Sequence, residues 1–482
     1  VTVLSPTGDG STLTGVVGAD SIDFLPTTDN TTNAYPHRHH YAVTRFGEIR
    51  HFGEEANYVS GQVYQQNQHG YKNVKRPVGK EDTGIREIIG VAQSTFVIFE
   101  DGDLYSWGYN GYGQLGIGNT TNSASMRSVL GNVVKFASAA GGYHTNRISC
   151  YAINTSGELY SWGTNVYGQL GHGNTTQLNS PVKVVISGLT ANESVVDVVA
   201  SCSYVTSAAI LTSSGRVFTV GYNANGQLGL GHTLNKHTFK RVSSLASKNV
   251  TKIRSIGGTR HSTAGYYRHS YYVVCDDGDT YAWGFNGSGQ LGIGNTTQQT
   301  SPVQTLVTGV SDITTSKDEW GGVFFQKTNG EIWRCGHNKY GNLGTGNTTD
   351  VSTPVQLTLY LSDGVANTSG VDRIQALASV THSYHRGWLI LMNDGRLYSC
   401  GYNGNGQLGV NSTANVMLFQ EVIVPLHGSR IKQLSMGGYS SSIHVLILLE
   451  DGRVYGMGHN AYGQCNVAHT SGYVTVPTAT FQ

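Results

Sequence analysis

Charged residues are scarce in this chain. Asp, Glu, Lys and Arg make up 13% of its 482 residues, about half of the usual quarter, and the formal net charge is +1. Nucleic acids and anionic membranes are bound mainly through clustered Lys and Arg side chains. We therefore expect no nucleic acid among the partners of this protein.

Long apolar runs and paired cysteines are also missing. The apolar stretch at residues 443–449 is far shorter than the roughly 20 residues that span a bilayer, so we expect no membrane insertion. The six cysteines form no C-x-x-C pair and have no His at zinc-finger spacing. His37, His39 and His40 lie close together, but adjacent residues on an extended chain point to opposite sides. We expect no metal site.

Catalytic signatures are absent as well. The sequence has no G-x-S-x-G elbow, no H-E-x-x-H pair and no P-loop. Its many Gly-x-Gly fragments recur with the repeat described below, so they are not nucleotide-binding fingerprints. We expect a protein that is not an enzyme and takes no cofactor.

Glycine and tyrosine, by contrast, are abundant. The chain has 64 glycines, nearly double the usual share of roughly 7%, and 28 tyrosines. With 38% apolar residues and little charge, it does not match the composition of disordered chains. These features indicate a folded, turn-rich protein made mostly of β-strands.

One motif recurs along the chain. The segment at residues 101–119, which contains Leu-Tyr-Ser-Trp-Gly and Gly-Gln-Leu-Gly, returns at residues 156–174. Eight units 52 to 65 residues apart carry a glycine where a tight turn is expected, and the first unit is degenerate. The turn glycines are Gly47, Gly102, Gly157, Gly215, Gly278, Gly330, Gly395 and Gly452. This spacing suits one four-stranded blade with its loops.

The positions of the motif have separate physical roles. Asp-Gly and Asn-Gly supply the positive φ angles that a two-residue hairpin turn requires. Five residues after each turn glycine stands an apolar residue, and a glycine follows it in all eight units. The apolar residues are Phe52, Trp107, Trp162, Val220, Trp283, Cys335, Cys400 and Met457. We expect Cys335 and Cys400 to pack like small hydrophobic residues, and the glycine to mark a close approach of backbones.

A recurring asparagine and the Gly-Gln-Leu stretch follow that glycine. The asparagines, present in seven units, are Asn110, Asn165, Asn223, Asn286, Asn338, Asn403 and Asn460. We expect each Asn side chain to form hydrogen bonds with the backbone of its own loop, and Gly-Gln-Leu to anchor the same loop.

This pattern resembles the repeat of the regulator of chromosome condensation (RCC1) family. Residues 141–145 and 257–262 also resemble the Gly-Gly-x-His-Ser stretch that precedes the second strand in that family. The resemblance implies an all-β fold, an RCC1-like β-propeller of four-stranded blades. The family has seven blades, whereas the repeat count favours eight, and both numbers stay open. We expect an N-terminal arm at residues 1–19 and the propeller at residues 20–482.

A partner is expected to bind at one rim of the ring. In a blade whose strands run up and down, the first-to-second and third-to-fourth loops share one face. The first-to-second loops vary most and are rich in Tyr, Trp and Arg, the residue types enriched at binding hot spots. The expected rim residues are Tyr143, His144, Arg147, Arg260, His261, Tyr266, Tyr267, Arg268, His269, Trp320, His382, Tyr384, His385, Arg386 and Trp388. The alternative is that the histidines are structural and the aromatic residues merely cap the blades.

Three functions compete. The first hypothesis is an extracellular or virion-surface structural protein, such as a phage tail fiber or capsid-associated module. It would bind a host receptor during attachment or contact neighbouring virion subunits as an oligomer within an assembly. It rests on the low charge and the Gly, Thr, Asn, Ser and Tyr content. The second, implied by the resemblance, is a cytoplasmic or nuclear guanine-nucleotide exchange factor or regulator of a small GTPase. The third is a secreted propeller that inhibits an enzyme.

Overall fold

We describe the protein from a computed structural model. It describes residues 22–24, 27–29, 39–44, 48–53, 68–91, 93–140, 147–201, 206–256, 268–316, 321–360, 366–367, 370–378, 386–437, 443–461, 465 and 472–480. The expected arm at residues 1–19 lies outside this set.

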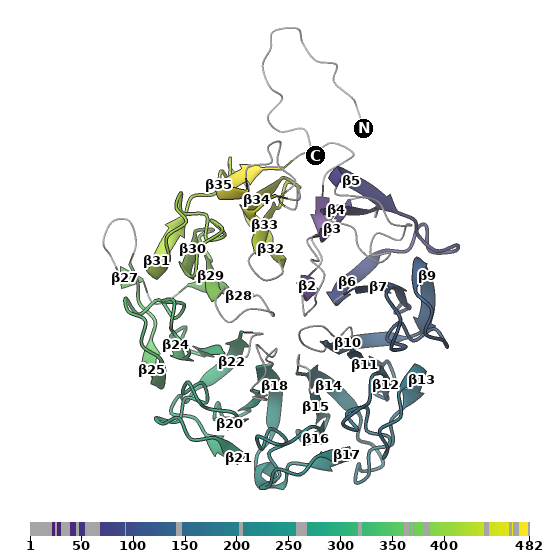
Figure 1. Cartoon of the computed structure of the whole chain (residues 1–482). Coiled ribbons are helices and arrows are strands. Elements are labelled where there is room, and N and C mark those ends of the chain that lie inside the picture. Colours follow the sequence, from purple (N-terminus) through teal and green to yellow (C-terminus); the bar gives the residue numbers. More distant parts are fainter. Residues whose placement is uncertain are drawn as a thin grey trace, which may run out of the picture.

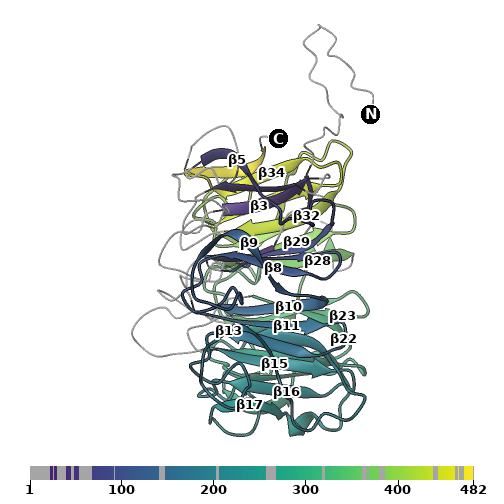
Figure 2. The same cartoon turned by 90° about the vertical axis from the view of Figure 1, so that its right-hand side faces the viewer.

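The described chain forms a ring of eight antiparallel, four-stranded blades, seen face-on in Figure 1 and edge-on in Figure 2. The all-β prediction is confirmed, and the degenerate first unit is a blade of the ring. From the inner to the outer strand, the blades are blade 1, β1 (Ile22–Phe24), β3 (His39–Thr44), β4 (Ile49–Gly53) and β5 (Gln68–Val74); blade 2, β6 (Ile85–Val91), β7 (Ser94–Phe99), β8 (Leu104–Gly108) and β9 (Ser123–Leu130); blade 3, β10 (Val133–Ala140), β11 (Ile148–Asn154), β12 (Leu159–Gly163) and β13 (Leu178–Lys183); blade 4, β14 (Val195–Ala200), β15 (Ser207–Thr212), β16 (Val217–Gly221) and β17 (Lys236–Arg241); blade 5, β18 (Val250–Ile256), β19 (Ser270–Cys275), β20 (Thr280–Gly284) and β21 (Gln299–Gln304); blade 6, β22 (Val310–Thr315), β23 (Gly322–Lys327), β24 (Ile332–Gly336) and β25 (Val351–Gln356); blade 7, β28 (Val371–Ala378), β29 (Arg386–Met392), β30 (Leu397–Gly401) and β31 (Val416–Val422); and blade 8, β32 (Ile431–Gly437), β33 (His444–Leu449), β34 (Val454–His459) and β35 (Tyr473–Ala479).

Three short elements lie outside this plan. Strand β2 (Thr27–Asp29) pairs in parallel with β6 and so adds a fifth strand to blade 2. Strands β26 (Leu359–Tyr360) and β27 (Ala366–Asn367) pair between blades 6 and 7. The helical element of the described residues is a 3-10 turn at Ser243–Leu245.

The turn between the second and third strands has the predicted conformation. Gly102 has a φ of 87°, and the Asp101 carboxylate accepts a hydrogen bond of 3.1 Å from the N–H of Asp103. The strands on either side are apolar and buried, with all six residues of β7 in the interior. Turn chemistry and apolar strands together explain why each Asp-Gly marks a hairpin.

Neighbouring blades are joined by the apolar residue that follows each turn. Trp162 and Trp283 are fully buried, and each indole N–H donates to a backbone carbonyl of the preceding blade, Gln114 or Gln227, at 2.9 Å. Cys335 and Cys400 are also fully buried, which confirms their predicted packing role. The Cys400 thiol donates at 3.2 Å to the carbonyl of the residue equivalent to Gln114, a contact that sequence reasoning missed.

The loop after the third strand is held as predicted. The Asn110 amide donates to the carbonyls of Asn119, at 2.9 Å, and Thr121, at 3.0 Å, while its oxygen accepts from the N–H of Leu115 at 2.9 Å. A Cβ added to Gly108 would lie 2.3 Å from a backbone carbonyl oxygen. The repeated Asn and Gly are therefore required by the local backbone.

The ring closes without an exchanged strand, because blade 8 is built from β32 to β35 and blade 1 from strands near the start of the chain. The apolar cluster between blades 8 and 1 contains four described residues, Ala42, Leu446, Leu448 and Val454. The cluster between blades 7 and 8 contains thirteen.

Candidate functional site

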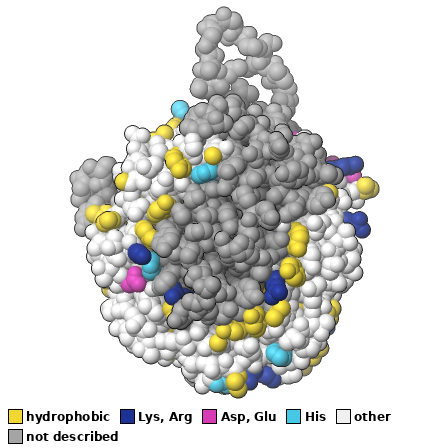
Figure 3. All heavy atoms as spheres, viewed as in Figure 1, with side chains coloured by type: hydrophobic (Ala, Val, Ile, Leu, Met, Phe, Trp, Pro, Cys, Tyr) yellow, Lys and Arg dark blue, Asp and Glu magenta, His cyan; other side chains and the backbone are white. Residues whose placement is uncertain are grey.

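The ring has two unlike faces. The loop face carries the first-to-second and third-to-fourth strand loops, and the turn face carries the Asp-Gly turns. Figure 3 shows the loop face, on which few acidic side chains are visible among the described residues.

The turn face is charged, but its charges pair with one another. Lys248 lies 2.8 Å from a carboxylate oxygen of both Asp277 and Asp279. This hydrogen-bonded ammonium lowers the pKa of Asp277 below its usual value. Lys183 and Glu158 form another exposed pair at 2.5 Å. Such pairs add little stability and leave little unmatched charge for a partner.

The described third-to-fourth loops of the loop face carry little charge. In blades 2 to 8, the described residues of the third-to-fourth loops include one acidic residue, Asp350, and one lysine, Lys339. The Asp350 carboxylate is occupied, since it accepts a 2.8 Å hydrogen bond from the N–H of Asn338. Depletion of charge is typical of the centre of protein–protein interfaces.

Half-buried aromatic side chains take the place of charges there. We call the following residues of these loops the aromatic girdle: Tyr109, Tyr112, Tyr167, Tyr222, Phe285, Tyr340 and Tyr402. Girdle residues of neighbouring blades contact each other, with ring centroids 5.2 Å apart for Tyr167 and Tyr222 and 5.8 Å apart for Tyr340 and Tyr402. The girdle therefore continues across blade boundaries.

Two arginines lie over the girdle. The Arg147 guanidinium is 5.6 Å from the ring centroid of Tyr112, and that of Arg268 is 5.0 Å from Phe285. Both distances are within the range of cation–π attraction. These arginines belong to the predicted rim, and the structure places them beside aromatic residues that the prediction did not include.

The girdle had a signal in the sequence that we did not use. Its members stand one or four residues after the repeated glycine of the third strand, as Tyr109 and Tyr112 do after Gly108. We interpreted this stretch only as a loop anchor. These two motif positions often hold an aromatic residue although the loop backbone does not require one. That recurrence in the sequence indicates the girdle.

Two predicted rim residues are wrong. His269 is fully buried, and Trp388 is 1% exposed, with its ring centroid 4.4 Å from that of Phe324. Trp388 lies within β29, whose residues pack between blades, and His269 directly precedes β19. Both side chains are thus part of the interior.

The other predicted rim residues are not placed by the structure. Arg386 begins β29, where only its backbone is described. Outside the described residues lie Tyr143, His144, Arg260, His261, Tyr266, Tyr267, Trp320, His382, Tyr384 and His385. Their role on the rim stays a prediction.

The wall of the central channel is a second concentration of polar groups. Each inner strand of blades 2 to 8 has a bulge, and the residue after it alternates in charge over six consecutive blades. These residues are Glu87, Lys135, Asp197, Lys252, Asp312 and Arg373.

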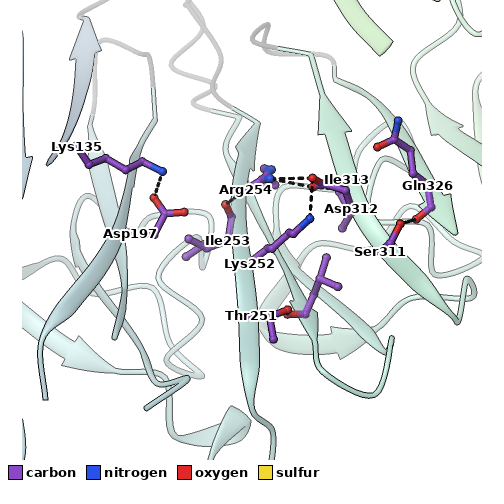
Figure 4. A network of polar contacts seen from close by, with 11 residues as sticks. Lys135, Asp197, Thr251, Lys252, Ile253, Arg254, Ser311, Asp312, Ile313 and Gln326 are labelled. Atoms are coloured by element: carbon purple, nitrogen blue, oxygen red, sulfur yellow. Dashed lines mark hydrogen bonds and ion pairs between the residues drawn. The ribbon is translucent and has the colours of Figure 1, made fainter. Parts of the chain in front are cut away.

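Figure 4 shows how these charges meet between blades. Lys135 pairs with Asp197. Asp312 receives both Lys252, at 2.9 Å, and Arg254, at 2.8 Å. Because opposite charges neutralise one another along the wall, this part of the channel joins blades and does not form a charged funnel for a ligand.

The remaining chemistry of the described residues is sparse. They contain no group of three His, Cys, Asp or Glu side chains that could hold a metal ion. In the same part of the chain, no helix is long and apolar enough to cross a bilayer. The five described cysteines are unpaired and buried, and burial raises the pKa of Cys275 to about 12. Protonated, buried thiols are inert.

The repeat of this chain matches a known family. The pattern of the family described as Regulator of chromosome condensation (RCC1) repeat matches more than half of the chain, at residues 101–146, 156–208, 214–264, 277–315, 329–370 and 394–443. A second pattern with the same description matches residues 431–464.

Similar proteins come from plants, animals and yeast. The chain is 28% identical to the ultraviolet-B receptor UVR8 of Arabidopsis thaliana, over 80% of this chain and 79% of that protein. It is 29% identical to the human E3 ubiquitin-protein ligase HERC2 over 73% of this chain, which spans only 7% of the length of HERC2.

Solved structures show the same fold. Prp20p from Saccharomyces cerevisiae, described with its binding properties to Gsp1p and histones, has a TM-score of 0.53 at 20% identity, over 79% of this chain and 86% of that one. Human WBSCR16 has a TM-score of 0.54 at 18% identity, over 79% and 94%. At these identities the likeness concerns the fold alone.

These matches contradict the hypothesis of a virion-surface or adhesion module. The relatives named above include a receptor, a ligase and a protein studied for binding Gsp1p and histones, and none of these three is a virion or adhesion protein. The low charge that suggested a virion protein is instead a property of the repeat, whose loops use Gly, Asn and Thr for backbone hydrogen bonds. The chain belongs to the RCC1 repeat family.

Proposed function

We propose that this chain is a non-enzymatic regulator that works in the cytoplasm or nucleus and binds a protein partner on its loop face. A small GTPase is the first partner to test, since the resemblance to RCC1 implies guanine-nucleotide exchange. The expected contact surface is the aromatic girdle with Arg147 and Arg268.

One observation carries the proposal. The loop face combines half-buried aromatic rings, two arginines and almost no carboxylates in its described part. Tyr and Arg dominate the residues whose truncation costs most at protein interfaces. The turn face has the opposite character, with exposed ion pairs that satisfy themselves.

Two further facts support the proposal. Prp20p, which shares the fold, was described with its binding to Gsp1p and histones, so a propeller of this kind suits protein partners. The described cysteines are unpaired. Unpaired cysteines suit the reducing interior of a cell better than a secreted protein, where disulfides form and persist.

The test compares a loop-face variant with a turn-face variant. The loop-face variant carries Tyr167→Ala, Tyr222→Ala and Arg268→Ala, and the control carries Glu158→Ala and Lys183→Ala. Each is used to capture proteins from source cells and to accelerate the release of a fluorescent GDP analogue from the small GTPases of those cells.

We expect the loop-face variant to lose both the captured partner and the acceleration, and the turn-face control to keep them. Equal capture by the two variants would contradict docking on the loop face. If the native protein accelerates nucleotide release from no GTPase, the choice of partner is wrong, while capture through the loop face would still stand.

A further inference from the structure

One blade carries a buried arginine where four other blades have a small hydroxyl. At the middle of the third strand, the side chains of Ser106, Ser161, Thr219 and Ser399 donate to a carbonyl of their own loop at 2.7 to 2.9 Å. In β24 the equivalent residue is Arg334, which is 5% exposed. A small self-satisfied group is thus replaced by a buried cation.

This cation is poorly satisfied within the chain. Arg334 Nη2 donates to the carbonyl of Gly344 at 3.2 Å, but Nε and Nη1 have no hydrogen-bond partner among the described residues. None of the ion pairs of the described residues includes Arg334. Two N–H groups of a charged side chain are therefore buried without an acceptor.

The facing blade has a smaller residue than blades 3 and 5 have at the same place. Trp162 and Trp283 fill this position in blades 3 and 5, where the indole nitrogen lies beside the glycine that ends Gly-Gln-Leu-Gly. Blade 7 has Cys400 instead, and Gly344 is the equivalent glycine. The Arg334 guanidinium contacts the carbonyl of Gly344 at this junction, where the Phe419 ring and Cys400 pack beside the glycine.

Burial does not remove the charge of this arginine. Desolvation lowers the pKa of Arg334 to about 10, so the guanidinium remains protonated at neutral pH. Burial also raises the pKa of the nearby Cys400 thiol, which stays neutral. A buried charge without a counter-charge costs several kcal/mol. A water molecule can accept the N–H groups, but only an anion can also balance the charge.

We propose that Arg334 binds a small monovalent anion such as a halide between blades 6 and 7, with an unpaired N–H of its guanidinium as donor. The anion neutralises the guanidinium and stabilises the folded ring at this junction. The site lies inside the ring and is independent of docking on the loop face.

The direct experiment uses the native protein and bromide as probe. Crystals grown without halide are soaked in bromide, and anomalous scattering locates the ion. In solution, thermal unfolding is followed as chloride replaces the bulky anion gluconate at constant ionic strength. We expect a bromide peak beside the guanidinium and a melting temperature that rises with chloride and saturates.

The matched variant is Arg334→Ser, which restores the residue that blades 2, 3 and 7 already have. Because a serine there can donate to the carbonyl of Leu343, as Ser106 does to the equivalent leucine, we expect this variant to fold. Its melting temperature should not change as chloride replaces gluconate.

Two results would overturn the proposal. The first is the absence of bromide at Arg334 together with the same chloride response in both proteins. The second is a melting temperature of the native protein that changes with pH as a thiol titrates, together with no such change in Cys400→Ala. The counter-charge of Arg334 would then be the Cys400 thiolate.

Discussion

Replacing Asn286 by alanine tests the repeated loop anchor in blade 5. The Asn286 amide donates to the carbonyls of Asn295, at 2.9 Å, and Thr297, at 3.1 Å, and its oxygen accepts from the N–H of Leu291 at 2.9 Å. Leu291 is fully buried, so its orphaned N–H costs about 1–3 kcal/mol. The two carbonyls belong to exposed residues and can turn to water, at about 0.5–1.5 kcal/mol each. We expect a loss of about 3 kcal/mol in the free energy of unfolding.

Urea denaturation measures the loss, and hydrogen exchange of residues 285–298 shows whether it begins in the loop. The control is Asn295→Ala in the same loop, an exposed residue whose oxygen accepts from the N–H of Thr297 at 2.9 Å and, at the longer distance of 3.5 Å, from the Asn286 amide. This variant should lose no more than about 1 kcal/mol. If Asn286→Ala were no less stable than the control, the loop would be held by other contacts and our account of the repeat would fail.

Three further predictions concern other features of the ring. Gly336→Ala should prevent folding or strongly lower the yield of soluble protein, because the new Cβ would lie 2.2 Å from a backbone carbonyl oxygen; normal expression and melting would contradict this. Lys252→Asp and Asp312→Lys should each lower the melting temperature, and the variant that carries both substitutions should recover part of the loss. If the two losses simply add in the double variant, this ion pair does not couple the blades. Lys248 holds the pKa of Asp277 below its unfolded value of about 3.9. The pair therefore stabilises the fold above that pH, and this stabilisation is lost as the pH falls through the pKa of Asp277 in the folded protein. Asp277→Asn should therefore flatten the acid limb of a stability–pH curve, and an unchanged limb would rule out a contribution from the pair.

The repeated scaffold was predictable because the local backbone geometry of one unit requires the residue at each position of the motif. The Asn at 110 and its equivalents, and the glycine after each third strand, serve contacts within one unit, so their recurrence alone reveals their role. The cysteines at 335 and 400 were interpreted correctly for the same reason, since they align with buried tryptophans.

Contacts between units were harder to predict. The hydrogen bond from Trp162 to the carbonyl of Gln114 joins residues 48 apart in sequence, and no pattern within one unit encodes it. The alternating charges of the channel were visible at one position of each inner strand, but their meaning depends on which blades are neighbours. The number of blades was ambiguous because the first unit lacks much of the motif.

The candidate site was predicted only in part. The rim was placed on the loop face by counting loops, and Arg147 and Arg268 do lie beside the girdle. Trp388 was misplaced because an aromatic residue near a strand start was assigned to the loop when it belongs to the strand. The virion or adhesion hypothesis was wrong because the low charge on which it rested is a property of the repeat.

The bonds that join one blade to the blade before it give the ring a direction. Trp162, Trp283, Cys335 and Cys400 each donate to a carbonyl contributed by the preceding unit. During synthesis the earlier unit leaves the ribosome first, so its acceptor is in place when the next donor emerges. The nascent ring can therefore grow as an arc, each finished blade serving as the template for its successor, until blade 8 meets blade 1.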